Sequence, residues 1–260
     1  MCLLVLAWMS HPRYRLVVAA NRDEFHDRPA APLAWWGDGA PMLAGRDLAA
    51  GGTWMGITRA GRFGAVTNFR DLEHVPATDA PSRGTLVPEF LAGVAEPVEF
   101  MERLRESAAR FAGFNVIAGG SRSLCYLSNR GGTVPRELEP GIYGLSNHEL
   151  DSPWPKLLKT RARFAAELES DEPDVAALFE LLADRAPADV GTQPDTGLPP
   201  EMERALSSPF VLHPRYGTRC STVLLAGRDG RIVAAERRFD AAGRQTGATR
   251  IEFIGDEPRE

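Results

Sequence analysis

Two short apolar runs open the chain. Residues 2–8 and 14–20 are almost entirely hydrophobic, and the polar stretch 10–13 separates them, which is the pattern of a buried β-hairpin. If this stretch closes the hairpin as a four-residue loop, Met9 pairs with Tyr14, and antiparallel register brings Cys2 opposite Asn21. We therefore expect the polar run 21–24 to follow the second strand and to lie beside the start of the chain.

A second hairpin is predicted between residues 53 and 68. Its strands are residues 53–58 and 63–67, joined by a turn around Ala60 and Gly61, and Asn68 closes the second strand. This pairing places Thr53 opposite Asn68. Apolar residues then recur at spacings of three and four, which predicts helices at 85–91 and 98–111.

The rest of the chain returns to strands, then helices, then strands. The predicted strands are 114–118, 124–127, 142–145, 221–226, 232–238 and 250–254, the helices are 155–168 and 175–186, and a loop rich in Pro and Gly spans 188–200. This order does not alternate as βαβ units, so a doubly wound parallel sheet is disfavoured. We expect an α+β fold, a four-layer αββα sandwich of antiparallel sheets, built as a single domain over residues 1–260.

The composition narrows the possible functions. Hydrophobic residues make up 43% and charged residues 25%, as in ordinary globular proteins, and the 30 Lys and Arg are dispersed, so we expect no nucleic-acid partner. A membrane-spanning helix needs about 18 consecutive apolar residues, and no stretch of the chain is that long. Residues 2–9 also lack the basic start and cleavage site of a signal peptide, so we expect no integral membrane contact and a cytoplasmic location.

The cysteines and histidines show no CxxC, HxxxH or HExxH spacing, which predicts no metal site.

Cys2 is the first candidate for chemistry. Removal of Met1 would leave Cys2 with a free α-amine, whose pKa of about 8 lies close to the thiol pKa of about 8.5, so the amine can accept the thiol proton without a histidine. The alternative is that Cys2 begins a buried strand as a small apolar residue. A place in or near the core is also what we expect of Cys125 and Cys220, in or beside later strands.

The four polar residues at 21–24 need partners. Asn21, Arg22, Asp23 and Glu24 could form a charged cradle that orients the amine and binds the polar end of a substrate. They could equally form a solvated turn or a helix cap, with Arg22 in a surface ion pair of little energetic value.

Asn68 suits an oxyanion donor. An amide N–H at the end of a strand can be aimed at developing negative charge, which is worth about 3 kcal/mol for one donor, although Asn is also common in turns. Thr53 follows two glycines that could admit a ligand close to the backbone or simply make a tight turn. Three tryptophans near this region could line an apolar pocket or fill the core: Trp35, Trp36 and Trp54.

Ordered motifs along nearly the whole chain carry a resemblance to a known family. They are Met1-Cys2-Leu3-Leu4, NRDEF at 21–25 with Arg28-Pro29, LAGRDL at 43–48, GGTW at 51–54, TNFRD at 67–71, SRG at 82–84, GFN at 113–115, LSN at 145–147 and GTRCSTVLL at 217–225. In these motifs the chain resembles the NRDE-motif family, whose eukaryotic members are called transport and Golgi organisation protein 2.

The resemblance implies an N-terminal-nucleophile (Ntn) hydrolase-like fold. By pattern the chain is similar to penicillin V acylase and conjugated bile acid hydrolase, which cleave amides. That likeness matches Cys2 to the nucleophile, Asn68 to the oxyanion-hole asparagine, Asn147 to a second active-site asparagine and Arg219 to a late arginine.

The chain departs from those amidases at the NRDE motif. The amidases carry an arginine and an aspartate three residues apart, whereas the same spacing here joins Asn21 to Glu24. Arg22 and Asp23 could substitute from adjacent positions, but adjacent residues of a regular strand point to opposite faces.

Two functions follow as hypotheses. The first is an amidohydrolase in which Cys2 cleaves the C–N amide bond of an N-acyl small molecule and no cofactor is required. The second is a non-enzymatic carrier, since the resemblance also implies haem trafficking or acyl-CoA binding, with His26, His148, His213 or Cys2 as candidate axial ligands of haem. In both cases the expected partner is a small amphipathic or apolar ligand, and the oligomeric state is left open.

Overall fold

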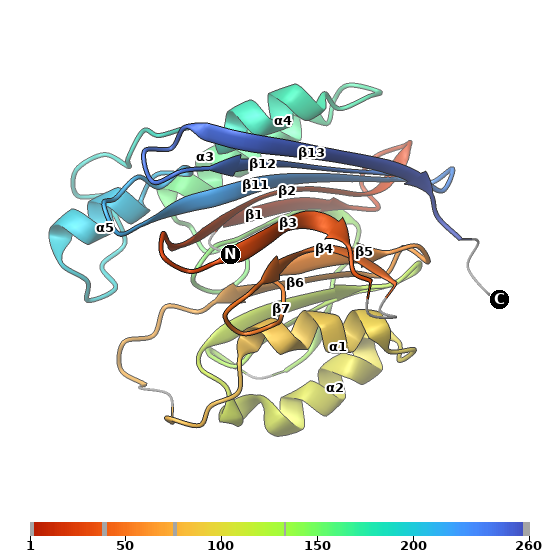
Figure 1. The fold of residues 1–260 in the computed structure, drawn as a ribbon, viewed down its shortest axis with the longest axis horizontal. Coiled ribbons are helices and arrows are strands. Elements are labelled where there is room, and N and C mark those ends of the chain that lie inside the picture. Colours follow the sequence, from red (N-terminus) through yellow and green to blue (C-terminus); the bar gives the residue numbers. More distant parts are fainter. Residues whose placement is uncertain (1–2, 38–40, 75–76, 133, 257–260) are drawn as a thin grey trace.

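The computed structural model describes residues 3–37, 41–74, 77–132 and 134–256, and they fold into four layers (Figure 1). Two antiparallel sheets lie face to face, and helices cover the outer face of each. The predicted α+β sandwich of class αββα is therefore confirmed.

The first sheet, sheet A, joins the two ends of the chain. Its strands are β1 (Leu3–Trp8), β2 (Tyr14–Phe25), β10 (Gly141–Leu145), β11 (Tyr216–Gly227), β12 (Arg231–Phe239) and β13 (Gln245–Ile254). They lie in the order β10-β1-β2-β11-β12-β13. The N-terminal hairpin thus sits in the middle of the sheet, where both of its faces are covered.

The second sheet, sheet B, comes from the middle of the chain. Its strands follow each other in sequence order and are β3 (Ala30–Trp35), β4 (Met42–Asp47), β5 (Met55–Thr58), β6 (Phe63–Asn68), β7 (Phe114–Gly119), β8 (Leu124–Ser128) and β9 (Arg136–Glu137). Each pair of neighbours is antiparallel, and α1 and α2 lie in the one long connection, between β6 and β7.

Two pairs of helices form the outer layers. α1 (Leu86–Ala92) and α2 (Pro97–Ser107) pack on sheet B, while α3 (Pro155–Glu167) and α4 (Val175–Leu182) pack on sheet A. The remaining helical segments are α5 (Pro200–Leu206) and the 3-10 turns η1 (Arg83–Thr85) and η2 (Ala108–Arg110). Capping residues determine where two of these helices begin. Pro97 is the first residue of α2, within a capping box of Glu96 and Glu99, and the Asp174 carboxylate caps the start of α4.

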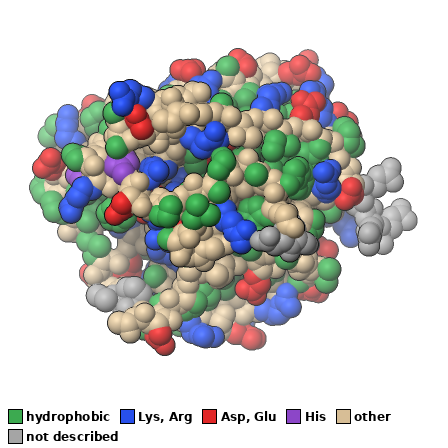
Figure 2. All heavy atoms as spheres, in the orientation of Figure 1, with side chains coloured by type: hydrophobic (Ala, Val, Ile, Leu, Met, Phe, Trp, Pro, Cys, Tyr) green, Lys and Arg blue, Asp and Glu red, His purple; other side chains and the backbone are tan. Residues whose placement is uncertain are grey.

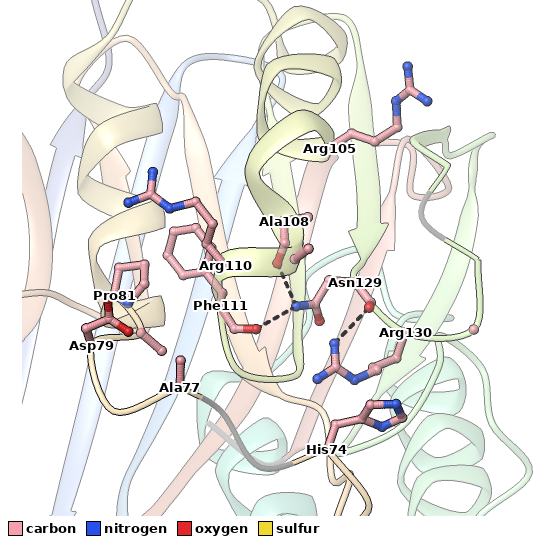
Figure 3. Close-up of a pocket in the computed structure, with 13 residues that line it drawn as sticks. His74, Ala77, Asp79, Pro81, Arg105, Ala108, Arg110, Phe111, Asn129 and Arg130 are labelled. Carbon is pink, nitrogen blue, oxygen red and sulfur yellow. Dashed lines mark hydrogen bonds between the residues drawn. The ribbon is translucent and has the colours of Figure 1, made fainter.

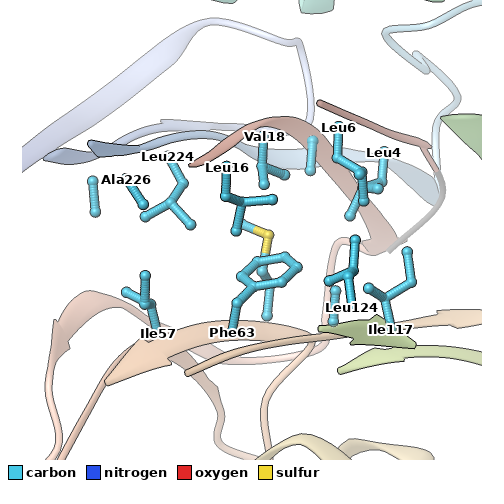
Figure 4. Close-up of a cluster of buried hydrophobic side chains, with 14 of the residues drawn as sticks. Leu4, Leu6, Leu16, Val18, Ile57, Phe63, Ile117, Leu124, Leu224 and Ala226 are labelled. Carbon is cyan, nitrogen blue, oxygen red and sulfur yellow. The ribbon is translucent and has the colours of Figure 1, made fainter. Parts of the chain in front are cut away.

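The main core lies between the sheets (Figure 4). Side chains alternate along β1, so that Leu4, Leu6 and Trp8 enter this core while Leu3, Val5 and Ala7 pack towards α3 and α4. Every residue of β1 is buried. An uninterrupted apolar strand is what burial on both faces requires.

The predicted register of the first hairpin is wrong by one residue. Leu3, not Cys2, lies opposite Asn21, and the N–H of Met9 donates to the carbonyl of Arg15 at 2.8 Å. The loop is therefore one residue longer than expected, with Met9 in the left-handed region at φ 49°. Nδ1 of His11 accepts the N–H groups of Arg13 and Tyr14 and holds the longer loop in place.

The polar run 21–24 does not follow β2 but lies inside it. β2 continues to Phe25 because β11 begins at Tyr216, earlier than the sequence pattern indicated, and pairs with it along its whole length. The pattern also missed β3, β4, β9 and α5, while α2 ends at Ser107, before the predicted position 111.

Among the described residues, no helix combines the length and the apolar character needed to cross a membrane. On the face shown in Figure 2, acidic and basic side chains are interspersed.

Candidate active site

The NRDE side chains divide between the two faces of sheet A. Asn21 points towards the helices, where its Nδ2 donates to the carbonyls of Leu182 and Pro209 at 2.9 Å and its Oδ1 accepts from Ser221 at 2.6 Å. Arg22 points the other way, into the space between the sheets. The strand alternation therefore prevents all four from forming one cradle.

Asp23 shares the face of Asn21. Its Oδ1 accepts a hydrogen bond from Thr218 at 2.6 Å, and Thr218 Oγ1 in turn accepts the N–H of Val211 at 2.9 Å. Asp23 and Asn21 therefore anchor the segment that precedes β11. We assign these two side chains to positioning the strand.

Arg22 is the central residue on the face of sheet A that looks into the space between the sheets. Its side chain is 4% exposed, and its guanidinium lies 4.4 Å from the ring centroid of Trp54. Nη2 is 3.8 Å from carboxylate oxygens of both Glu24 and Asp47. Nη1 is buried and finds no hydrogen-bond partner among the described residues. A buried hydrogen-bond donor without a partner costs free energy. A ligand oxygen that accepts from this N–H would remove that cost.

Asp47 contacts two of the basic side chains of the site, Arg22 and Arg28. Its Oδ2 accepts from Nε of Arg28 at 2.7 Å, and its Oδ1 accepts the N–H groups of Ala49 and Ala50. Burial alone would raise the pKa of Asp47, but these hydrogen bonds and the positive charge of Arg28 outweigh it and lower the pKa below its usual value. Asp47 is therefore an ionised carboxylate facing Arg22.

Two glycines allow the walls of the site to close. A Cβ on Gly45 would lie 2.4 Å from the Trp54 ring, and a Cβ on Gly52 would lie 2.2 Å from the carbonyl oxygen of Gly84. Gly52 therefore allows close backbone packing against η1, which is neither of the two roles considered for this glycine from the sequence. The N–H of Thr53 donates to the Gly84 carbonyl at 3.0 Å, so Thr53 precedes β5 and the predicted strand pairing with Asn68 is wrong.

These residues enclose a cavity of about 300 Å³, which we call the Arg22 pocket. This volume is at the lower end for small-molecule sites. Its lining residues are Arg22, Glu24, Phe25, Arg28, Asp47, Thr53, Trp54, Val66, Asn68, Ser82, Arg83, Gly84 and Tyr216. Three arginines face two carboxylates, so the lining carries an excess of one positive charge.

Asn147 does not line the Arg22 pocket but contacts the strand end that does. Its Nδ2 donates to the carbonyl of Asn68 at 3.1 Å, and its own carbonyl accepts the N–H of Arg70 at 2.7 Å. Asn115 donates to Thr67 at 3.1 Å and to the carbonyl of His148 at 3.0 Å, which ties the same two segments together. Asn147 therefore fixes the end of β6 that carries Asn68.

Arg219 holds the turn after β2. Its Nη1 donates to the carbonyls of Phe25 at 2.9 Å and His26 at 2.7 Å. Arg219 does not line the Arg22 pocket. Its contacts instead position Phe25, which does.

Five of the ten candidate residues thus meet in one cavity: Arg22, Glu24, Thr53, Trp54 and Asn68. Asn147 and Arg219 contact segments that line it, Asn21 and Asp23 lie on the opposite face of sheet A, and Cys2 lies outside the described residues. Sequence reasoning assigned no role to Arg28, Asp47, Arg83 or Tyr216, although the first three stand in motifs that it had singled out.

The other two tryptophans do not reach the Arg22 pocket. Trp35 packs edge-on against Phe253, and Arg46 lies over the Trp36 ring. Trp54 has both of its proposed roles, because it lines the pocket and belongs to the core between the sheets.

A larger hollow of about 720 Å³ lies between His74 and residues 77–81 on one side and the end of α2 on the other (Figure 3). None of the candidate residues lines it. Three of its four basic side chains already have acidic partners, since Arg130 and His74 pair with Asp71 and Arg105 pairs with Glu102. Volume alone therefore does not identify the site, and the Arg22 pocket is the better candidate.

Solved structures place the fold in a known class. The chain superposes on conjugated bile acid hydrolase from Clostridium perfringens, in a cysteine-to-alanine mutant, with a TM-score of 0.56 over 97% of this chain and 92% of that one, at 9% identity. An arginine-to-leucine variant of the same enzyme gives a TM-score of 0.52 at 10% identity, over 96% of this chain and 92% of that one. The protein therefore has the Ntn-hydrolase fold.

Sequence comparison identifies the family. Residues 1–241 match the family described as Transport and Golgi organisation 2, and the chain belongs to it. The Transport and Golgi organization protein 2 homolog of Bos taurus is 35% identical over 258 residues, and the Mus musculus homolog is 33% identical, each covering 91% of this chain and 92% of the relative. The resemblance drawn from the motifs is confirmed.

Proposed function

We propose that this protein is an amidohydrolase that cleaves the C–N bond of an N-acyl small molecule, with Cys2 as nucleophile. The observation that carries the proposal is the buried Nη1 of Arg22, a donor without a partner that faces a cavity beside the start of β1. Leu3, opposite Asn21, is one peptide bond from Cys2. On β2, Arg22 follows Asn21 directly, and its side chain shares with Leu4 the face of sheet A that looks into the space between the sheets.

The reaction would use the α-amine of Cys2 as its base. After loss of Met1, the amine takes the thiol proton and the thiolate attacks the carbonyl carbon of the amide. The C–N bond then breaks, the amine product leaves with the proton, and a thioester remains on Cys2. Water hydrolyses the thioester, which releases the carboxylic acid and restores the thiol.

The Arg22 pocket would stabilise the charge that develops on the carbonyl oxygen. Asn68 lines the pocket at the end of β6, and Asn147 fixes that strand end, so an amide donor is held ready before substrate arrives. Arg22 supplies a second donor through Nη1. Asp47 and Glu24 keep the guanidinium oriented, each 3.8 Å from it.

The hydrolase is better supported than the haem carrier. Nε2 of His26 is bonded to the carbonyl of His213 at 3.0 Å, and His148 lies between the rings of Phe69 and Trp154 with Nδ1 bonded to Ser152. None of these three histidines lines the Arg22 pocket. The described lining therefore does not fit haem held through a histidine.

The proposal is tested by assaying release of primary amines from a panel of N-acyl amides. We expect turnover by the chain that has lost Met1, none by Cys2→Ala, and about a hundredfold lower kcat for Asn68→Ala, since one oxyanion donor is worth about 3 kcal/mol. Leu48→Ala is the control, because Leu48 is 56% exposed next to Asp47 and does not line the pocket. Equal turnover by Cys2→Ala would contradict the mechanism, and saturable binding without turnover would favour a carrier.

A further inference from the structure

Three of the four edges of the two sheets carry features that prevent pairing with another strand. β9 has two residues, β10 has five with glycines at Gly141 and Gly144, and β3 contains Pro32 and a register break between Ala31 and Ala34. Short length, proline and bulges are the usual ways of protecting an edge.

The fourth edge, β13, lacks these features. It has ten residues and no proline, and its register with β12 shifts only at its beginning, between Arg238 and Phe239. No strand of the described residues pairs with its outer side. Figure 1 shows β13 running along the border of sheet A. Its free backbone groups form a regular template about 33 Å long, at about 3.3 Å per residue.

The exposed face of β13 carries one charge of each sign. Ile251 and Phe253 pack on the core between the sheets, so Ala248, Arg250, Glu252 and Ile254 share the opposite face, where they are exposed. Glu252 Oε1 accepts from Arg231 at 2.7 Å, while its Oε2 is 3.6 Å from its own Arg250. Ile254 is 67% exposed.

We propose that β13 pairs with β13 of a second copy of this chain, antiparallel and centred on Ile251. This register places Arg250 opposite Glu252 of the second copy, and because the contact is two-fold symmetric the pair forms twice. Ile254 then lies opposite Ala248 of the second copy, which covers part of its exposed side chain. Sheet A becomes continuous across both copies.

The charges of Arg250 and Glu252 favour this register over its neighbours. A shift of two residues in one direction would place Arg250 opposite Arg250, and in the other direction Glu252 opposite Glu252. Like charges directly opposite each other are unfavourable in antiparallel pairs. Only the register centred on Ile251 brings opposite charges together on this face.

Sedimentation of charge-reversed variants tests the pairing without any knowledge of the substrate. We expect the wild type to form dimers as concentration rises, and Arg250→Glu and Glu252→Arg each to raise the dissociation constant about tenfold, since two pairs become repulsive at up to about 1 kcal/mol each. The double variant restores opposite charges and should return to the wild-type constant. Arg103→Glu, on the exposed side of α2, is the control and should behave as wild type.

Three results would overturn the proposal: a wild type that stays monomeric, dimers that survive both single reversals, or a double variant that is not restored. Hydrogen exchange provides a second readout that does not depend on mutation. Amides of β13 should exchange more slowly at high protein concentration, while those of β10, the other edge of the same sheet, should not change. Protection of β10 instead would place the contact elsewhere.

Discussion

At the scale of single residues, Trp54 connects the chemistry of the pocket to the packing of the sheets. Its ring carries the Arg22 guanidinium at 4.4 Å on the pocket side and also belongs to the core between the sheets. Gly45 provides the space for this ring, because a Cβ there would lie 2.4 Å from two of its carbon atoms. The position of Arg22 therefore depends on the absence of a side chain at residue 45.

Gly45→Ala tests this dependence. The added methyl group must displace the Trp54 ring, so we expect the free energy of unfolding to fall by about 1–3 kcal/mol, as for overpacked cores. Gly37→Ala is the matched control, since no described atom beyond its chain neighbours lies within 4 Å of a Cβ at that position. Urea unfolding at neutral pH measures both. Equal stability of the two variants would show that Trp54 is not held by this contact.

At the scale of elements, one carboxylate joins the two sheets. The register of β3 breaks between Ala31 and Ala34, and the freed N–H of Leu33 donates to Glu236 on β12 at 3.1 Å. Arg238 donates to the same oxygen at 3.2 Å. Burial raises the pKa of Glu236 above its usual value despite these two hydrogen bonds, which lower it.

This raised pKa makes stability depend on pH. The folded state keeps the proton of Glu236 over a range where the unfolded state, with its pKa of 4.5, has lost it, so stability falls as pH rises from 4.5 through the higher folded pKa. Glu236→Gln keeps an acceptor for Leu33 but cannot ionise. We expect its stability relative to wild type to increase with pH over that interval, measured by urea unfolding. Glu169→Gln, at an exposed position, should show no such trend, and parallel curves for wild type and Glu236→Gln would refute the argument.

The elements also show how far the sequence predicts this structure. Apolar runs predicted β1, β7 and β8, because burial on both faces leaves a continuous signal. β3 and β4 were missed, since Pro32 interrupts one and the polar pair Arg46 and Asp47 ends the other. The hairpin register was wrong because the His11 ring stabilises a longer loop. Asp47 received no role because its partner Arg28 is 19 residues away, and only the fold brings them together.

At the scale of the whole molecule, the sandwich protects two of the three thiols. Cys125 lies in the core under α1 and α2, and its burial, with a smaller effect of Glu137, raises the thiol pKa to about 11. Cys220 lies between the sheets, and burial raises its pKa further. Because the thiolate is the reactive form, neither should react in the folded protein. Cys2, bonded to the first described residue of β1, is left as the candidate nucleophile.

Brief alkylation of the native protein followed by intact-mass analysis tests the central claim most directly. Untagged protein is treated with iodoacetamide at neutral pH, its mass is measured, and the labelled residue is located by peptide mapping. The account predicts a chain that has lost Met1 and carries a single label on Cys2, with Cys125 and Cys220 labelled only after denaturation. Retention of Met1, or a native protein whose Cys2 stays unlabelled, would contradict it.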